Sequence, residues 1–225
     1  MGRVIVIGDI HGCYDELRAL IDAIGPAAGD RIIALGDLVD RGPASERVLE
    51  FFRHEPAASS IMGNHERKHV RSERGEIQPA VSQIIVRREL GERYAGWVAF
   101  MASFPRHLEL PEAILIHGMF EPGVPLAEQK DSVVIGTMSG ELHMRNHYPS
   151  PWYEQYRGPK PLVFGHHDYL RQGGEPLIRE GLVYGIDTGC VYGGRLTALI
   201  LPEFRIVSVP SRENYWARIR AESGL

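Results

Sequence analysis

Three apolar runs near the N-terminus, at residues 3–7, 31–35 and 59–62, each lead into a turn flanked by glycine. The first two runs are rich in β-branched residues, which favour strands. Apolar residues then recur with helical spacing over residues 14–24 and again over residues 45–53, where Ser45 is a candidate helix cap. This alternation of strand, loop and helix predicts an α/β fold.

The turns after these and later apolar runs carry side chains that bind metal ions. In open α/β sheets ligands gather outside the carboxyl ends of the strands, so we expect the turns to face one crevice. The candidate metal ligands are Asp9, His11, Asp37, Asn64, His117 and His166.

The mixture of oxygen and imidazole donors favours Mn²⁺, Zn²⁺ or Fe over Mg²⁺ or Ca²⁺. Asp9 and His11 stand two residues apart, so on an extended stretch both side chains point the same way and can bind one ion. Asp37 can bridge two ions through its two oxygens. Two ions about 3.5–4 Å apart can stabilise the attacking and leaving oxygens of an in-line displacement and lower the pKa of a bridging water. The set predicts metal-assisted hydrolysis of a phosphate ester.

Three residues beside the ligands are candidates for the catalytic steps. His65 directly follows Asn64, which constrains it from binding the same ion and suits it to protonate the leaving group. Asp40 is expected to orient the His65 imidazole. Arg41 offers a two-pronged guanidinium for phosphate oxygens, which a lysine could not reproduce.

The rest of the chain is expected to complete one domain spanning residues 1–225. Residues 65–102 are polar and favour helices, with arginines and glutamates on a solvated face. Strands are predicted at residues 107–110, 113–117, 162–165, 177–179, 182–186, 195–201 and 204–209. Residues 121–160, rich in Pro, His, Tyr and Gly, are expected to form a long, partly irregular excursion on the substrate side.

Composition narrows the function classes. The formal net charge is −4 and there is no lysine-rich block, so a footprint for duplex nucleic acid is not expected. The two cysteines, Cys13 and Cys190, and the absence of a signal-like or long apolar segment indicate a cytoplasmic protein with no membrane partner. The partner we expect is a phosphorylated substrate: a phosphopeptide, a nucleotide or a nucleic-acid end. Nothing in the sequence indicates the oligomeric state.

Three motifs, Gly-Asp-x-His-Gly at residues 8–12, Gly-Asp-x-Val-Asp-Arg-Gly at 36–42 and Gly-Asn-His-Glu at 63–66, carry a family resemblance. In this order and spacing they resemble the phosphoprotein phosphatase branch of the calcineurin-like metallophosphoesterases. The resemblance implies an αββα sandwich of two mixed β-sheets flanked by helices. It also implies two divalent ions, with Mn²⁺ as the first expectation and Fe, Zn or Ni as alternatives.

The resemblance further implies how the ligands divide. Asp9, His11 and Asp37 would hold one ion, and Asp37, Asn64, His117 and His166 the other. His65 matches the family's general acid and Arg41 its phosphate-binding arginine. The chain has Gly-His-His at residues 165–167 where the family often has Gly-His-Thr, so His167 is a neighbouring alternative to His166. It also has His-Gly-Met at 117–119 in place of His-Gly-Gly.

A more distant element, Gly-Thr-Met-Ser-Gly at 136–140 followed by 156–158 and 163–166, resembles the phosphatase domain of bacterial polynucleotide kinase-phosphatases. That group shares its scaffold with symmetrical diadenosine-tetraphosphate hydrolases and bacterial serine/threonine phosphatases. It implies that Asp187 joins Arg41 and Asn64 in contacting the substrate, the alternative being a turn-capping role for Asp187. Arg145 and Arg157 are candidates for a second phosphate contact or are structural.

Three functions are consistent with these residues. The first is a phosphatase for phosphomonoesters, either protein phosphoserine and phosphothreonine or a nucleic-acid or nucleotide phosphate. The second is a symmetrical dinucleoside-polyphosphate hydrolase. The third is a non-catalytic binding scaffold, against which the full ligand set and His65 argue.

Overall fold

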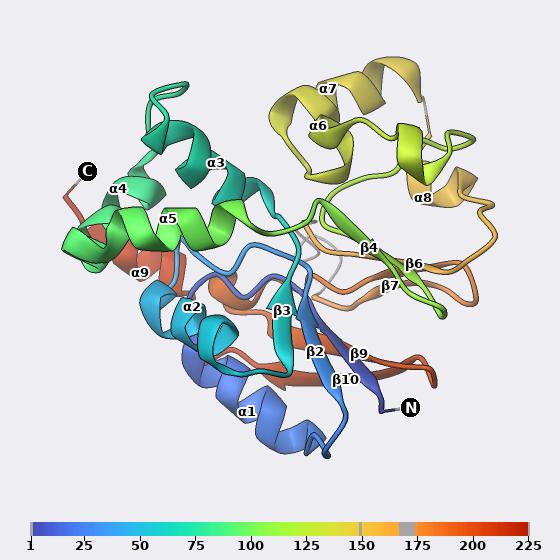
Figure 1. Ribbon diagram of the computed structural model, residues 1–225, viewed down its shortest axis with the longest axis horizontal. Coiled ribbons are helices and arrows are strands. Elements are labelled where there is room, and N and C mark those ends of the chain that lie inside the picture. Colours follow the sequence, from blue (N-terminus) through green and yellow to red (C-terminus); the bar gives the residue numbers. More distant parts are fainter. Residues whose placement is uncertain (1, 149, 167–173, 225) are drawn as a thin grey trace.

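Two five-stranded β-sheets pack face to face, and helices cover the outer face of each (Figure 1). The computed structural model describes residues 2–148, 150–166 and 174–224. The layers therefore follow the order helices, sheet, sheet, helices. This is the αββα sandwich that the sequence motifs implied.

The first sheet has the strand order β10-β9-β1-β2-β3. Strands β1, β2 and β3 run parallel, as the strand-loop-helix pattern predicted, and β9 runs antiparallel to both β1 and β10. The strands are β1 (Val4–Ile7), β2 (Arg31–Ala34), β3 (Ala58–Ser60), β9 (Arg195–Leu201) and β10 (Arg205–Pro210).

The second sheet has the order β4-β5-β6-β8-β7, with β5, β6 and β8 parallel. Strand β4 pairs antiparallel with β5, and β7 pairs antiparallel with β8. The strands are β4 (His107–Glu109), β5 (Ile114–Ile116), β6 (Leu162–Phe164), β7 (Leu177–Arg179) and β8 (Val183–Gly185).

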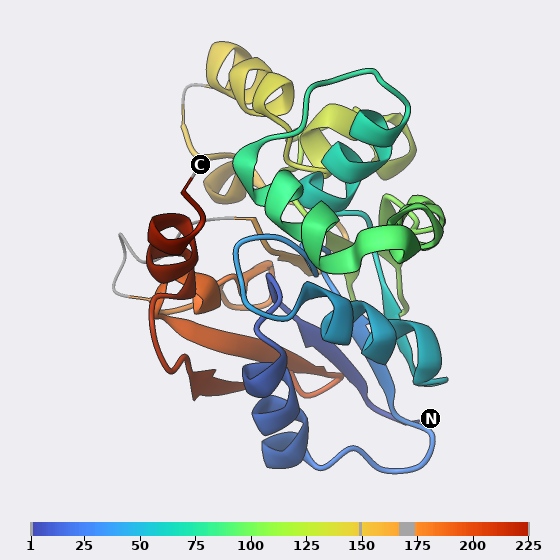
Figure 2. The same cartoon turned by 90° about the vertical axis from the view of Figure 1, so that its left-hand side faces the viewer.

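The helices α1 and α2 lie along the outer face of the first sheet (Figure 2). α1 places Leu17, Leu20 and Ile24 on that face and ends at Gly25, whose φ of 59° lets the backbone turn out of the helix. The helices are α1 (Tyr14–Ile24), α2 (Ser45–His54), α3 (Asn64–Glu73), α4 (Val81–Leu90), α5 (Tyr94–Ala102), α6 (Asp131–Val134), α7 (Met138–His147), α8 (Trp152–Gln155) and α9 (Tyr215–Glu222).

Strand β1 shows how the core forms. Its four residues are all buried, because successive side chains point to opposite faces and both faces are covered. Ile5 and Ile7 pack toward the helices, whereas Val4 and Val6 pack between the two sheets. A third apolar cluster lies between the second sheet and helices α6 to α8. The sheets are thus held at a fixed separation, and so are the turns at their ends.

Several expectations require correction. Ser45 does not cap α2; Ala44 is the cap residue, and the Ser45 hydroxyl instead accepts a hydrogen bond from the backbone N–H of Asp40. Residues 121–160 are more helical than expected, since they contain α6, α7 and α8. The longest of these helices, α7, has ten residues and is capped by Thr137. The predicted polar helical region also ends in α5, whose residues Trp97 and Met101 belong to the core. None of the helices in the described ranges is long and apolar enough to cross a membrane.

Candidate active site

The parallel strands of both sheets deliver the predicted ligands to one place. β1 and β2 end just before Asp9 and Asp37, α3 begins at Asn64, and β5 ends just before His117. His166 follows β6. A cavity of about 160 Å³ lies there, and every predicted site residue except Asp40 and His117 lines it. The structure therefore brings the ten predicted residues together.

Asp37 lies at the centre of the candidate ligands. Its Oδ2 is 3.4 Å from Nε2 of His11, and its Oδ1 is 3.5 Å from Nε2 of His117. Burial opposes ionisation of Asp37, but the charges that His117, His65 and His11 carry when protonated, together with the backbone N–H of His65, hold the carboxyl pKa below its usual range. The carboxylate is therefore charged, with one oxygen toward each histidine.

Backbone carbonyls fix the tautomers of the two histidines. Nδ1 of His11 donates to the carbonyl of Val39, and Nδ1 of His117 donates to the carbonyl of Leu35, each over 2.8 Å. Burial lowers the pKa of His11 to about 3 and that of His117 to about 4. Both rings are therefore neutral near pH 7 and turn the Nε2 lone pair toward Asp37, as metal-binding histidines do.

The second group of donors converges on Asn64. Its Oδ1 is 3.0 Å from Nε2 of His117 and 3.1 Å from Nδ1 of His166. The His117 nitrogen is an acceptor in this tautomer, so two acceptors face each other. Such a pair is stable when a cation lies between the two atoms, and the donor chemistry therefore fits a metal ion.

Three carboxylates, those of Asp9, Asp37 and Asp187, line the cavity. Burial, followed by the charges of Asp187 and Asp37, raises the pKa of Asp9 well above its usual range. The backbone N–H of His166 donates to Oδ1 of Asp9. The negative charges of these carboxylates repel each other unless a cation offsets them, so this group of donors also fits a metal ion. The Asp187 carboxylate lines the cavity and also accepts from the backbone of Gly189, so the turn-capping and cavity positions coincide.

His65 and Asp40 form a buried pair behind the ligands. Asp40 also accepts hydrogen bonds from His69, Gln83 and Ser82. Burial opposes its charge, yet the hydrogen bonds from His65 and His69 hold the Asp40 pKa well below its usual range. The other nitrogen of His65, Nε2, is buried with no hydrogen-bond partner in the described part of the chain, 4.0 Å from Oδ2 of Asp37. An unpartnered nitrogen facing the cavity is suited to exchange a proton with a bound molecule.

Arg41 reaches the cavity from the same turn as Asp40. Its guanidinium donates to Nε2 of His11 over 3.2 Å and lies 5.6 Å from the centre of the Tyr192 ring. It therefore contacts the lone pair that His11 would offer to a metal ion.

Backbone strain is concentrated at this site. Five predicted site residues other than glycine have positive φ angles, a region that costs such residues about 1–3 kcal/mol each. They are His11 (47°), Asp37 (48°), Asp40 (74°), Arg41 (70°) and His166 (67°). Close approach adds a second constraint, since a Cβ on Gly63 would lie 2.2 Å from Oδ1 of Asp37, and one on Gly165 would lie 2.2 Å from Oδ1 of Asp9.

Two further residues, Glu66 and Glu141, support the site without having been predicted from the sequence. The Glu66 carboxylate accepts backbone hydrogen bonds from Asp37, Leu38 and Gly63, which ties the turn after β2 to the start of α3. Glu141 lies 3.1 Å from Nε2 of His166 through Oε1. Glu66 stood in the Gly-Asn-His-Glu motif, whereas no local pattern indicated Glu141.

Three alternatives from the sequence have different outcomes. His167 lies outside the described residues. Arg157 donates to the backbone carbonyls of Glu154 and Tyr156 and lines a separate cavity, so it is not placed at the site. Arg145 is exposed and lines another separate cavity beside Trp152.

The comparisons with known proteins bear directly on this geometry. The family model described as calcineurin-like phosphoesterase matches residues 2–198. The chain belongs to this family. Membership implies a hydrolase that acts on phosphoric esters and uses divalent metal ions, in agreement with the two groups of donors around Asp37.

Similarity to other proteins covers almost the whole length of this chain. The chain is 32% identical to a protein of Halalkalibacterium halodurans named asymmetrical bis(5′-nucleosyl)-tetraphosphatase PrpE, covering 92% of this chain and 94% of that protein. A Bacillus subtilis protein of the same name is 30% identical, covering 93% and 95%.

Solved structures agree with the fold. A crystal structure provisionally assigned as a diadenosine tetraphosphatase matches with a TM-score of 0.76 and 30% identity, covering 93% of this chain and 94% of that chain. A cold-active protein-tyrosine phosphatase of a Shewanella species matches with a TM-score of 0.61 at 17% identity, covering 94% and 81%, and shows the likeness of fold alone.

Proposed function

We propose that the protein hydrolyses dinucleoside tetraphosphates asymmetrically, into a nucleoside triphosphate and a nucleoside monophosphate, with two Mn²⁺ ions. The observation that carries the two-metal part is the position of Asp37, whose two oxygens face His11 and His117 at 3.4 and 3.5 Å. The names of relatives at 30–32% identity support the substrate class. Their asymmetrical cleavage differs from the symmetrical hydrolysis considered from the sequence.

The proposed ligand sets follow the two groups of donors. Asp9, His11 and Asp37 would hold one ion, and Asp37, Asn64, His117 and His166 the other. Mn²⁺ suits this mixture of carboxylate, amide and neutral imidazole donors. When bound, the two ions would activate a water as nucleophile and offset the charge that develops on the phosphate oxygens.

His65 is proposed to protonate the leaving oxygen. Nδ1–H of His65 donates to Asp40, so the proton to be transferred resides on Nε2, the atom that faces the cavity. Burial lowers the His65 pKa, whereas the negative charges of Asp37 and Asp40 favour the protonated ring. Asp40 thereby acts as a positioning residue, and His65 as the general acid.

Arg41 and Asp187 are proposed to contact the substrate. Arg41 lies in the cavity wall beside His11, where its guanidinium can bind two oxygens of the attacked phosphate. Asp187 also lines the cavity, and its carboxylate accepts a hydrogen bond from the backbone N–H of Gly189.

A panel of substrates tests the proposal. Mn²⁺-loaded protein is incubated with diadenosine tetraphosphate, a phosphoserine peptide and p-nitrophenyl phosphate, and the products are separated by anion exchange. We expect ATP and AMP in equal amounts from diadenosine tetraphosphate, at the highest kcat/KM of the panel. Formation of two molecules of ADP from diadenosine tetraphosphate would contradict asymmetrical cleavage. A higher kcat/KM for the phosphopeptide would indicate a phosphomonoesterase instead.

A further inference from the structure

A second cavity, of about 350 Å³, adjoins the catalytic one and shares Arg41, Asn64 and His166 with it. One wall is formed by Arg67, Lys68 and Arg71 of α3. The opposite wall is the segment that precedes and begins α7, and Figure 1 shows these two helices on either side of the upper part of the molecule. We call this second cavity the basic groove.

The three cations of α3 lie on one side of the helix. Arg67 and Arg71 are four residues apart and Lys68 and Arg71 three, so their side chains are neighbours on the helix, and like charges at this spacing repel each other. Among the described residues, neither Arg67 nor Lys68 has a salt bridge, whereas Arg71 pairs with Glu76 at 2.9 Å. Repelling charges gathered at a cavity are balanced by an anion that binds there.

We propose that the basic groove binds the polyphosphate chain of the substrate beyond the attacked phosphorus, through Arg67 and Lys68. This inference rests on the proposed function, since it assigns where the remaining phosphates lie. Arg41 lines both cavities, so a chain of phosphates can pass from the catalytic cavity into the groove. The volume of the groove suits a ligand larger than one phosphoryl group.

The opposite wall is compatible with an anionic chain. It contains the hydroxyl groups of Thr137 and Ser139, which are 2.9 Å apart, at the start of the ten-residue helix α7. Hydroxyl donors and the first turn of a helix both favour phosphate oxygens. The acidic group in the lining is Glu141, whose Oε1 lies 3.1 Å from His166. Positive charge thus exceeds negative charge along the groove.

The groove also offers an account of cleavage position. If three phosphates occupy it and the catalytic cavity together, the bond presented to the proposed nucleophile is fixed by how far the chain extends along α3. Cations at Arg67 and Lys68 would then decide between asymmetrical and symmetrical products. A phosphomonoester has no phosphates to place in the groove.

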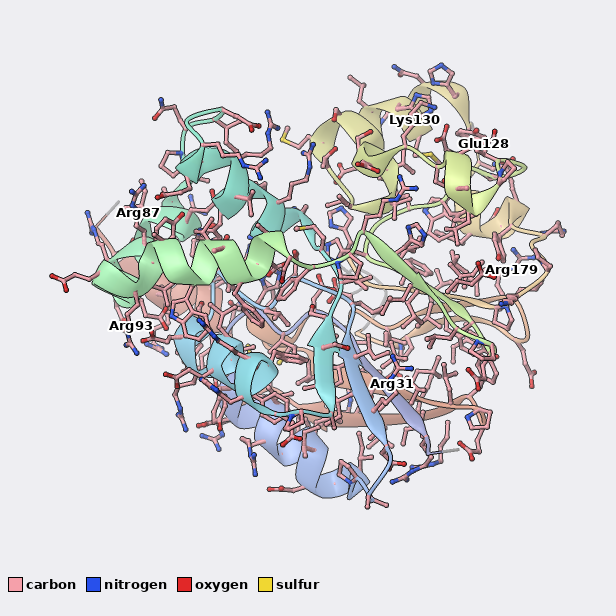
Figure 3. The ribbon with its side chains drawn as sticks, in the orientation of Figure 1. Arg31, Arg87, Arg93, Glu128, Lys130 and Arg179 are labelled. Carbon is pink, nitrogen blue, oxygen red and sulfur yellow. The ribbon has the colours of Figure 1, made fainter. Side chains whose placement is uncertain are left out.

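The test uses inorganic tripolyphosphate as the probe and the full chain loaded with excess Mn²⁺. Affinity is measured by calorimetry for the wild type, Arg67→Ala, Lys68→Ala and the control Arg88→Ala, an exposed arginine of α4 outside both cavities. Figure 3 shows that its neighbour Arg87 lies at the far edge of the helical layer. We expect tripolyphosphate to bind about tenfold more weakly to each groove variant, as loss of a charged hydrogen bond predicts, and equally well to the control. Circular dichroism confirms that each variant is folded.

Kinetics supply a second readout. In Arg67→Ala and Lys68→Ala, kcat/KM should fall at least about tenfold more for diadenosine tetraphosphate than for p-nitrophenyl phosphate. Equal tripolyphosphate affinity in the wild type and both variants, or equal losses for the two substrates, would overturn the groove assignment. If the wild type binds tripolyphosphate in the groove but does not cleave diadenosine tetraphosphate, the proposed function fails while the groove stands. If the wild type cleaves diadenosine tetraphosphate but both variants keep its tripolyphosphate affinity and its kinetics, the groove assignment fails while the proposed function stands.

Discussion

The imidazole of His65 donates a hydrogen bond from Nδ1 to Oδ2 of Asp40 across 2.5 Å. Asp40 is fully buried and is held by three further side-chain donors, so it fixes both the tautomer and the orientation of the ring. The second nitrogen of His65 therefore faces the cavity with no partner among the described side chains. In the proposed mechanism this pair serves proton transfer and not metal binding, so the two proposed roles can be tested independently.

Replacing His65 with Ala should lower turnover by about 10²–10⁴-fold while the metal content stays the same, because His65 is proposed to donate a proton and not to bind a metal ion. The measurement is kcat on a series of aryl and alkyl phosphates together with elemental analysis. The loss should be smaller for good leaving groups, which need no protonation. An equal loss for nitrophenyl and alkyl phosphates would exclude His65 as the proton donor.

Replacing Arg41 with Lys should reduce kcat by about tenfold or more and raise KM, because lysine keeps the charge but cannot bind two phosphate oxygens at once. Steady-state kinetics with metal analysis measures both effects. The matched control is Arg93→Lys, an exposed arginine at the outer edge of the helices (Figure 3), which should behave like the wild type. Wild-type kinetics in Arg41→Lys would remove Arg41 from the phosphate site.

Replacing Glu141 with Ala should weaken Mn²⁺ binding by about 10–100-fold, the usual effect of losing a carboxylate that orients a metal-binding histidine. The physical reason is the 3.1 Å contact between Glu141 and Nε2 of His166, which leaves Nδ1 directed toward Asn64. Mn²⁺ titration followed by electron paramagnetic resonance gives the affinity. Glu128→Ala, an exposed acid labelled in Figure 3, is the control. Unaltered affinity in Glu141→Ala would show that the contact does not orient His166.

The fold should lose stability in acid partly through Asp30. Hydrogen bonds from the Arg3 side chain, then from the backbone of Ala27, lower the Asp30 pKa to about 2. A carboxyl whose pKa is lower in the folded state stabilises the fold above its unfolded pKa of about 4, and this contribution disappears as the pH falls through about 2. Asp30→Asn should therefore be less stable than the wild type at about pH 6, and the difference should shrink toward about pH 2.

Urea unfolding of wild type and Asp30→Asn across that pH range measures the difference. Asp22→Asn is the control. Asp22 is largely exposed, and its ion pair with Arg18 is long, at 3.9 Å. A difference between wild type and Asp30→Asn that stays constant with pH would contradict the role of the Arg3–Asp30 pair.

Local sequence patterns predicted an α/β fold and the turns that carry the candidate ligands, whereas the two-sheet sandwich was implied by the family resemblance. Apolar runs that end in glycine-flanked turns indicate strands, and turns at the ends of parallel strands face one crevice. The Asp9, Asp37 and Asn64 turns follow this rule directly. The same argument needs no knowledge of how the helices pack.

Other features depend on contacts between distant segments, which no local pattern carries. Glu141 and His166 are separated by 25 residues and meet because the segment that leads into α7 lies against the His166 ring. The basic groove likewise combines α3 with the start of α7, so its arginines resembled an ordinary solvated helical face in the sequence. The positive φ angles of residues such as Asp40 and His166 are also invisible locally, because tertiary packing imposes them.

The central claim is that two metal ions share Asp37, and the metal content of the protein tests it most directly. Protein stripped with a chelator, reloaded with Mn²⁺ and freed of excess metal is analysed by inductively coupled plasma mass spectrometry, for the wild type and for Asp37→Ala. We predict two ions per chain in the wild type and a loss of both in Asp37→Ala, since each of its oxygens faces a different group of donors. One ion or none in the wild type, or two ions retained in Asp37→Ala, would contradict the account.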